Sequence, residues 1–257
     1  MAFVDVDGAR LEVERIDVGR AAASPVVMLH EGLGSVAMWK DFPHRVAHAV
    51  NRDVVVYSRA GYGRSSPAKL PYAVRYMHDE ALAVLPRLLD ACGIGRPILL
   101  GHSDGGSIAL IHAAAANRPV AGLALMAPHV ICEDLSVASI AEARRAYEEG
   151  DLKRKLARWH DHVDCAFYGW NGAWLDPGFR SWDLRGFLPN IHVPAQIIQG
   201  EADQYGTIAQ VRAIEAGCAG IVETVMLPGV GHSPYREASD ATLAVLASFL
   251  ARSLHQM

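Results

Sequence analysis

A serine between two glycines is the residue of this chain whose surroundings most clearly suit chemistry. Ser103 is the centre of Gly-His-Ser-Asp-Gly at residues 101–105. The apolar residues 97–100 before it predict a buried strand, and residues 107–116 after it predict a helix. Glycines on both sides permit a sharp turn, and the following helix N-terminus favours an anion near the serine. The pattern indicates a nucleophilic serine, although a turn serine that caps a helix has the same local sequence.

A serine hydroxyl needs a base to take its proton and a further group to orient that base. Asp203 follows the apolar stretch 194–199, and His232 follows the stretch 221–227. In an open parallel sheet, ligands bind beyond the carboxyl ends of the strands. The serine, the aspartate and the histidine are therefore expected at one edge of a sheet. The other candidates for the acid are Glu201, Glu133 and Asp134.

Apolar runs and helical periodicity alternate along most of the chain. A hairpin is predicted from strands 2–6 and 11–17, with further strands at 26–30, 53–58, 97–100, 122–126, 194–199 and 221–227. Helices are predicted at 39–50, 72–92, 107–116, 207–217 and from about 236. Between 130 and 190 the strand pattern is absent, and helices are predicted at 136–149 and 151–168. The expected fold class is α/β, with a mostly parallel central sheet and helices on both faces.

Composition narrows the class of protein. The 257 residues are 51% hydrophobic and 20% charged, as in a soluble globular protein with a large core. The formal net charge of -4 and the lack of a Lys/Arg cluster argue against a nucleic-acid partner. No apolar run reaches the roughly 18 residues of a membrane span, and the acidic N-terminus is unlike a signal peptide. The four cysteines are widely spaced. We expect a cytoplasmic monomer or homodimer with reduced thiols and no membrane partner.

The chain resembles the α/β-hydrolase family over essentially its whole length. The resemblance rests on the Gly-x-Ser-x-Gly turn, the chain order serine, acid, histidine, and a glycine-rich loop after the early strand 26–30. It implies a core made of residues 1–129 and 191–257. It also implies a helical cap, residues 130–190, inserted after the sixth strand.

The same resemblance assigns the catalytic roles. It makes Ser103 the nucleophile, His232 the general base and Asp203 the orienting carboxylate. Members of the family with an aspartate nucleophile are disfavoured, because the turn carries a serine. No cofactor is implied.

The oxyanion that forms during acyl transfer needs hydrogen-bond donors already in place. One predicted donor is the backbone N–H of Asp104, the residue after the nucleophile. The second is predicted from the loop after His30, as Gly32 or Leu33. Most relatives have glycine directly after that histidine, whereas this chain has Glu31. The departure leaves the second donor open between the two residues.

Five side chains are predicted to contact the substrate: Asp104, Glu31, Trp159, Trp170 and Trp174. A carboxylate beside the nucleophile could pair with an amine, and the turn Ser-Asp-Gly-Gly resembles that of hydrolases acting on amino-acid esters. The tryptophans belong to the helical stretch, where they either line a pocket or hold the helices together.

The sequence therefore predicts a hydrolase of small carboxylic esters, with amino-acid esters as one candidate class, acting on a small-molecule substrate. The alternatives are a lactonase, a carbon–carbon bond hydrolase of aromatic catabolism with the same triad, and a ligand receptor without catalysis. A metal site is not expected, since His160 and Asp164 share a helix face as solvated pairs usually do.

Overall fold

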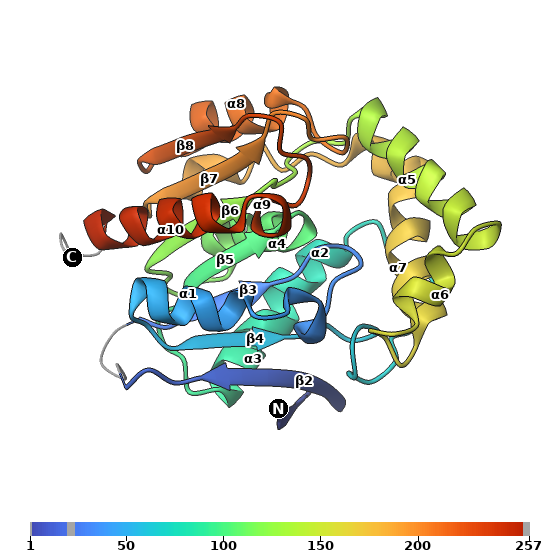
Figure 1. Cartoon of the computed structure of the whole chain (residues 1–257), viewed down its shortest axis with the longest axis horizontal. Helices are drawn as coiled ribbons and strands as arrows, with labels where there is room; N and C mark the ends of the chain where they lie inside the picture. The colour runs from blue at the N-terminus through green and yellow to red at the C-terminus, as the bar shows by residue number, and fades with distance from the viewer. Residues whose placement is uncertain (1, 20–23, 254–257) are drawn as a thin grey trace.

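The computed structural model describes residues 2–19 and 24–253. Within these residues eight strands form one sheet in the order β1-β2-β4-β3-β5-β6-β7-β8 (Figure 1). The strands are β1 (Ala2–Val6), β2 (Ala9–Ile16), β3 (Val26–Leu29), β4 (Val54–Tyr57), β5 (Ile98–His102), β6 (Gly122–Met126), β7 (Ala195–Gly200) and β8 (Val222–Leu227). β2 runs antiparallel to β1 and β4, and the other neighbouring strands are parallel. The predicted fold class is confirmed.

The hairpin β1–β2 turns at the predicted residues. Asp7 has φ 51° and Gly8 has φ 80°. Two successive residues with positive φ match the twist of a right-handed β-ribbon, which is why Asp-Gly favours such turns. The aspartate and glycine types thus account for the sharp connection.

Helices cover both faces of the sheet. They are α1 (Phe42–Val50), α2 (Tyr76–Asp79), α3 (Leu85–Ala91), α4 (Asp104–Ala115), α8 (Ile208–Gly217), α9 (Pro234–Glu237) and α10 (Ser239–Ser253). Strand side chains alternate between the faces: Val26 and Met28 of β3 pack with α1 and α10, whereas Val27 and Leu29 pack with α3 and α4. Each fully buried side chain of this size contributes about 1.5–3 kcal/mol. The apolar strands, covered by helices on both faces, therefore form the core. This core holds in place the carboxyl ends of the strands, where the predicted site residues lie.

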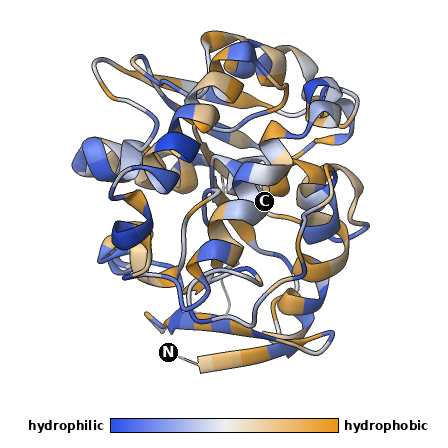
Figure 2. Ribbon diagram, turned by 90° about the vertical axis from the view of Figure 1, so that its right-hand side faces the viewer, coloured by the Kyte–Doolittle hydropathy of each residue, from blue (hydrophilic) through white to orange (hydrophobic). Residues whose placement is uncertain are grey.

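The stretch between β6 and β7 is helical. It contains α5 (Asp134–Glu148), α6 (Leu152–Leu156) and α7 (Val163–Leu175), followed by short 3₁₀ turns at Pro177–Ser181 and Leu188–Asn190. We call residues 130–190 the helical segment. It lies to one side of the sheet (Figure 1), and Figure 2, which views the molecule from that side, shows hydrophilic and hydrophobic residues mixed along the ribbon. Stacked aromatic rings join its helices, as between Tyr147 of α5 and Phe167 of α7, whose centroids are 3.6 Å apart.

Two predicted helices differ from the structure. The helix predicted at 72–92 begins at Tyr76 and contains a π-helical turn, Glu80–Val84. A side chain inserts at this turn, since Nδ1 of His112 lies 2.8 Å from the Ala81 carbonyl. The helix predicted at 151–168 is wrong: α6 ends at Leu156, and α7 begins at Val163.

The break between α6 and α7 is explained by the contacts of His160. His160 is buried, its Nδ1 accepts the N–H of Gly63 at 2.9 Å, and its Nε2 lies 3.0 Å from the Leu33 carbonyl. A continuous helix would carry the imidazole past these partners. Separately, none of the helices in the described part of the chain has the length and apolar character needed to cross a membrane.

Candidate active site

Ser103 stands on a strained turn between β5 and α4. Its φ is 52° and its ψ is -118°, values that residues with a side chain rarely adopt. The flanking glycines are required by close packing: a Cβ on Gly101 would lie 2.3 Å from the Gly105 carbonyl oxygen, and one on Gly105 would lie 2.0 Å from that of Leu29. The predicted strand, glycine-flanked serine and helix are all present.

Ser103, His232 and Asp203 form one chain of hydrogen bonds. His232 Nε2 is 2.9 Å from Ser103 Oγ. His232 Nδ1 is 2.8 Å from one Asp203 carboxylate oxygen and 2.9 Å from the other. The carboxylate accepts a hydrogen bond from Nδ1–H, which leaves the Nε2 lone pair facing the serine hydroxyl. The structure thus brings together the three side chains that the sequence placed after β5, β7 and β8.

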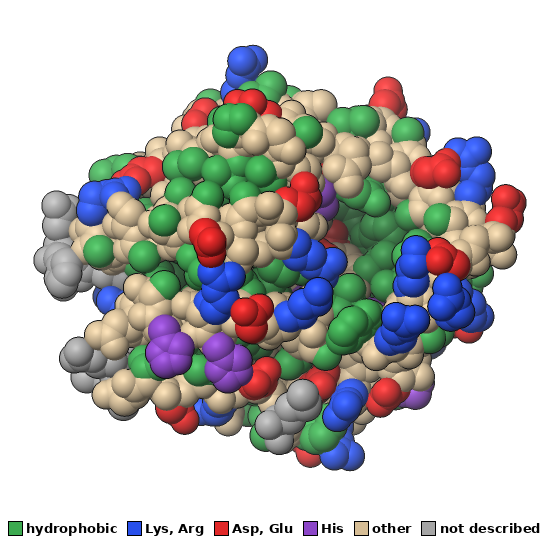
Figure 3. Space-filling model, in the orientation of Figure 1, with side chains coloured by type: hydrophobic (Ala, Val, Ile, Leu, Met, Phe, Trp, Pro, Cys, Tyr) green, Lys and Arg blue, Asp and Glu red, His purple; other side chains and the backbone are tan. Residues whose placement is uncertain are grey.

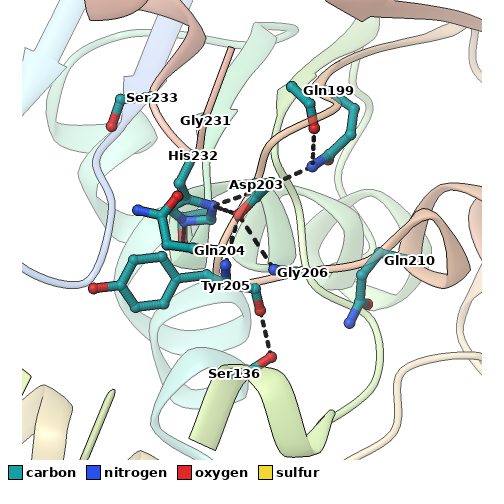
Figure 4. A network of polar contacts seen from close by, with 12 residues as sticks. Ser136, Gln199, Asp203, Gln204, Tyr205, Gly206, Gln210, Gly231, His232 and Ser233 are labelled. Carbon is teal, nitrogen blue, oxygen red and sulfur yellow. Dashed lines mark hydrogen bonds and ion pairs between the residues drawn. The ribbon is translucent and has the colours of Figure 1, made fainter. Parts of the chain in front are cut away.

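Asp203 is held by several further donors (Figure 4). Its Oδ1 accepts the backbone N–H groups of Tyr205 at 2.7 Å and Gly206 at 3.2 Å, and its Oδ2 accepts Gln199 Nε2 at 2.7 Å. Burial acts to raise the pKa of Asp203, but the hydrogen bond and charge of His232 outweigh burial and lower the pKa to about 2. Asp203 is therefore an ionised carboxylate with a fixed orientation at neutral pH.

The glycine-rich loop, residues 31–35, lies beside the serine and is held by a buried arginine. The Arg59 guanidinium donates to the carbonyl of His30 at 2.7 Å and to that of Glu31 at 3.0 Å. Gly32 and Leu33 of this loop line the same cavity as Ser103 and Asp104. These are the residues predicted to supply the oxyanion donors, and both candidates for the second donor, Gly32 and Leu33, face the site.

A cavity of about 130 Å³ opens at Ser103. In the space-filling view a hollow lies between the main body and the helical segment, with hydrophobic side chains in it (Figure 3). The lining residues come from both parts of the chain: Glu31, Gly32, Leu33, His102, Ser103, Asp104, His129, Ser136, Ile140, Trp170, Trp174, Tyr205, His232 and Ser233. The walls are mainly apolar and aromatic, with polar groups gathered at the serine.

Four of the five predicted contact residues line the cavity, and one does not. Glu31, Asp104, Trp170 and Trp174 are in its wall. Trp159 is not, and 36% of its surface is exposed. It lies in the turn between α6 and α7, next to the buried His160.

The carboxyl group of Asp104 already has partners within the protein. Oδ2 accepts the hydroxyl of Tyr76, and Oδ1 is 3.3 Å from Trp174 Nε1. The guanidinium of Arg59 lies 3.9 Å away. Burial raises the pKa of Asp104, although Arg59 and the two hydrogen bonds act to lower it. Both carboxylate oxygens of Asp104 are therefore already engaged by donors of the protein.

His129 is a wall residue that the sequence analysis did not single out. It is 2% exposed, and its ring centroid lies 5.5 Å from that of His232 and 5.2 Å from that of Trp174. Burial, with the neighbouring His232, lowers its pKa to about 3, so its ring is neutral near pH 7. His129 comes directly after β6, at the same sheet edge as the triad. The rule that found Asp203 and His232 would have found it too.

The residues considered for a metal do not form a site. His160 bonds to Gly63 and Leu33, whereas Asp164 bonds to Tyr147 and Lys153. Among residues 2–19 and 24–253, no group of three or more His, Cys, Asp or Glu side chains is arranged to hold a metal ion.

Comparison with known proteins gives the class that this fold and site define. A model of the alpha/beta hydrolase family matches residues 26–245, and the chain belongs to this family. Lipase LipV of Mycobacterium tuberculosis is 31% identical over 167 residues, which are 65% of this chain and 56% of that protein. The putative carbamate hydrolase RutD of Pseudomonas savastanoi is 42% identical over 92 residues, 35% of this chain and 33% of that protein.

Solved structures give the same fold. The enol-lactonase of Burkholderia xenovorans has a TM-score of 0.74 at 23% identity, covering 97% of this chain and 100% of the other. A carboxylesterase structure from Nitrososphaera gargenis has a TM-score of 0.77 at 18% identity, covering 99% and 100%. The chain spans between 12% and 56% of the length of the first three curated relatives it matches. These relatives include several proteins named as hydrolases.

Proposed function

We propose that this protein hydrolyses small carboxylic esters through an acyl-enzyme intermediate. The observation that carries the proposal is the hydrogen-bonded chain Ser103–His232–Asp203, of which Ser103 and His232 line a mainly apolar cavity. Ser103 Oγ attacks the ester carbonyl while His232 Nε2 takes its proton. His232 then gives that proton to the departing alcohol. Water, activated by the same imidazole, releases the acid and restores the serine.

The tetrahedral oxyanion is stabilised by backbone donors in this proposal. The N–H of Asp104 is one, and the N–H of Gly32 or Leu33 is the other. Each such donor contributes about 2.7–4 kcal/mol to lowering the barrier. The support comes from the loop positions described above, where Arg59 donates to the carbonyl of His30, just before the glycine-rich loop, and to that of Glu31 within it.

The volume of the cavity argues for a small substrate. An apolar cavity of about 150 Å³ holds one benzene molecule, so about 130 Å³ suits an acyl group of at most that size. We place neutral esters before amino-acid esters, because a substrate amine could bind Asp104 only by displacing Tyr76 or Trp174. The helical segment acts as a cap that limits the acyl chain, with Trp170 and Trp174 as its contacts.

A lactone is the second candidate substrate. In a cyclic ester the acyl and alcohol parts remain joined, so a compact cavity can enclose both. Two structural neighbours carry such names: the enol-lactonase of Burkholderia xenovorans, and an esterase described as an N-acyl homoserine lactone degrading enzyme. The carbon–carbon bond hydrolase reaction uses the same triad and is the third arm of the test below.

One experiment separates these possibilities. The protein is treated with a fluorophosphonate and then assayed on short-chain esters, lactones, thioesters, amino esters and vinylogous diketones, with Ser103→Ala as the blank. We expect a single adduct on Ser103 and the highest kcat/KM on a short neutral ester. A wild-type protein that forms no adduct and turns over nothing would instead be a ligand receptor. A higher kcat/KM on diketones than on esters would assign carbon–carbon bond cleavage.

A further inference from the structure

A second histidine, His102, contacts the backbone of His232, the proposed general base. His102, the residue before Ser103, is wholly buried, and its Nε2 is 2.7 Å from the carbonyl oxygen of His232. A carbonyl oxygen can only accept, so His102 Nε2–H is the donor. This bond holds the backbone of the residue whose side chain has to reach Ser103.

Glu31 lies at the other nitrogen of this ring. Its Oε2 is 3.4 Å from His102 Nδ1, within ion-pair distance of a protonated ring, and this nitrogen has no hydrogen-bond partner in the described part of the chain. Its Oε1 is 3.4 Å from the guanidinium of Arg236, which belongs to α9 just after His232. Burial acts to raise the pKa of Glu31, but His102 and Arg236 outweigh it and hold the pKa well below its usual range. Glu31 is therefore an ionised carboxylate that faces His102.

Aromatic rings lock the imidazole of His102 in this orientation. Tyr235 meets it edge-on at 5.3 Å between centroids, and Trp39 does so at 6.3 Å. Nε2–H is engaged by the His232 carbonyl, so Nδ1 can donate to the Glu31 carboxylate only when both ring nitrogens carry a proton. An imidazolium between these two acceptors satisfies both of them. Such an arrangement resembles the support that fixes ring orientation around other functional histidines.

We propose that Glu31 and His102 form a positioning pair for the catalytic histidine: Glu31 orients His102, and His102 Nε2–H fixes the carbonyl of His232. The effect on rate rests on the proposed ester hydrolysis. Glu31 belongs to the glycine-rich loop, so the pair connects the loop predicted to bind the oxyanion with the loop that carries the base.

Variants of His102 separate positioning from simple core packing. His102→Gln retains a side-chain N–H that can reach the His232 carbonyl, whereas His102→Leu has similar size and no donor. Misplacing a catalytic group by about 1 Å can cost on the order of a hundredfold in rate. We expect His102→Leu to lower kcat by about tenfold to a hundredfold with KM within about threefold, and His102→Gln to recover most of that loss. Equal kcat values for the two variants would overturn the proposal.

A double-mutant cycle tests whether Glu31 acts through His102. Glu31→Gln alone should lower kcat, but it should add little to His102→Leu, because coupled residues are not additive. Arg236→Gln tests the other contact of Glu31, and the exposed Glu142→Gln is the matched control for loss of one negative charge. Full additivity of Glu31→Gln and His102→Leu would mean that Glu31 does not orient His102.

A spectroscopic measurement keeps the proposal testable without any substrate. The proton between His232 Nδ1 and Asp203 is followed by NMR in the wild type, His102→Gln and His102→Leu proteins. We expect its downfield signal in the first two and its loss or rapid exchange in the third. An unchanged signal in all three refutes the positioning role. If the wild-type protein shows the signal but hydrolyses no ester, the proposed ester hydrolysis is refuted and the positioning role is not. If His102→Leu does not fold, the comparison of wild type, His102→Gln and Glu31→Gln decides, since Glu31→Gln should weaken the signal.

Discussion

A Cβ atom added to Gly32 would lie 2.1 Å from Nε1 of Trp170. The indole of α7 therefore packs directly on the backbone of the glycine-rich loop, and no side chain fits between them. This contact joins the helical segment to the residues predicted to stabilise the oxyanion. Position 32 accepts glycine alone unless the tryptophan moves.

Gly32→Ala should lower kcat/KM, because the added methyl group forces either Trp170 or the loop out of place. We expect a loss on the order of tenfold to a hundredfold, as for other small displacements at a reacting centre. Steady-state kinetics on a short ester measures the loss. Gly172→Ala is the matched control: it lies in α7 with open space around its Cβ position, and helix propensity there favours alanine by up to about 1 kcal/mol. Unchanged kinetics in Gly32→Ala would contradict the contact.

Asp203 makes the protein less stable in acid. Its pKa is lowered in the folded state to about 2 from an ordinary value near 3.8, so its stabilising effect is present above about pH 4. That effect is lost as the pH falls through the folded-state value, for a total of about 2 kcal/mol. The free energy of unfolding is measured in urea for the wild type and Asp203→Asn between about pH 5 and pH 2. We expect the loss of about 2 kcal/mol only in the wild type.

Asp203→Asn should also lower kcat by a factor on the order of 10⁴, because the amide favours the wrong tautomer of the histidine. Asp240→Asn, at a side chain that is 94% exposed, is the control for both measurements. A mutant with near wild-type kcat would show that another carboxylate orients His232.

His129→Phe should raise KM while leaving the acid limb of the pH profile in place. The pKa of His129 is about 3, lowered first by burial, so His129 is neutral wherever the enzyme works. Protonation of His129 therefore makes no contribution to the acid limb of kcat/KM near neutral pH. The measurement is kcat/KM against pH for both proteins. A shift of the limb in the mutant by a full pH unit would mean that His129 contributes to it.

Asp104→Asn should leave the preference between an α-amino ester and its des-amino analogue unchanged. If Asp104 bound the amine, losing a charge-assisted hydrogen bond of about 1.5–3 kcal/mol would change the ratio of kcat/KM values by about tenfold or more. The partners of Asp104 in the structure, Tyr76, Trp174 and Arg59, predict no such change. A tenfold drop in the ratio would restore the amino-ester interpretation.

The triad was predictable because it depends on local signals. Ser103, Asp203 and His232 each follow an apolar run, and parallel strands bring such positions to one edge whatever the loops do. His129 also follows the carboxyl end of a parallel strand, but it lies after a turn that contains Pro128 and no motif marks it. The sequence analysis therefore did not single it out. Strand positions were equally predictable, because strands buried on both faces read as continuous apolar runs.

The helical segment was less predictable, for a physical reason. Helical periodicity continues through residues 157–162, yet the chain turns there because His160 finds partners at Gly63 and Leu33, about a hundred residues away. The role of Glu31 depends on Arg236 in the same way. Contacts of this range leave no periodic trace in the sequence, so they require the fold.

His160 also connects two parts of the molecule. The same imidazole holds the turn of the helical segment and, through the Leu33 carbonyl, the loop beside the nucleophile. A ligand that displaced this turn would have to break the bond to the Leu33 carbonyl, and it would thereby release the loop beside Ser103. The size of such a ligand would then affect the rate of reaction as well as entry to the cavity.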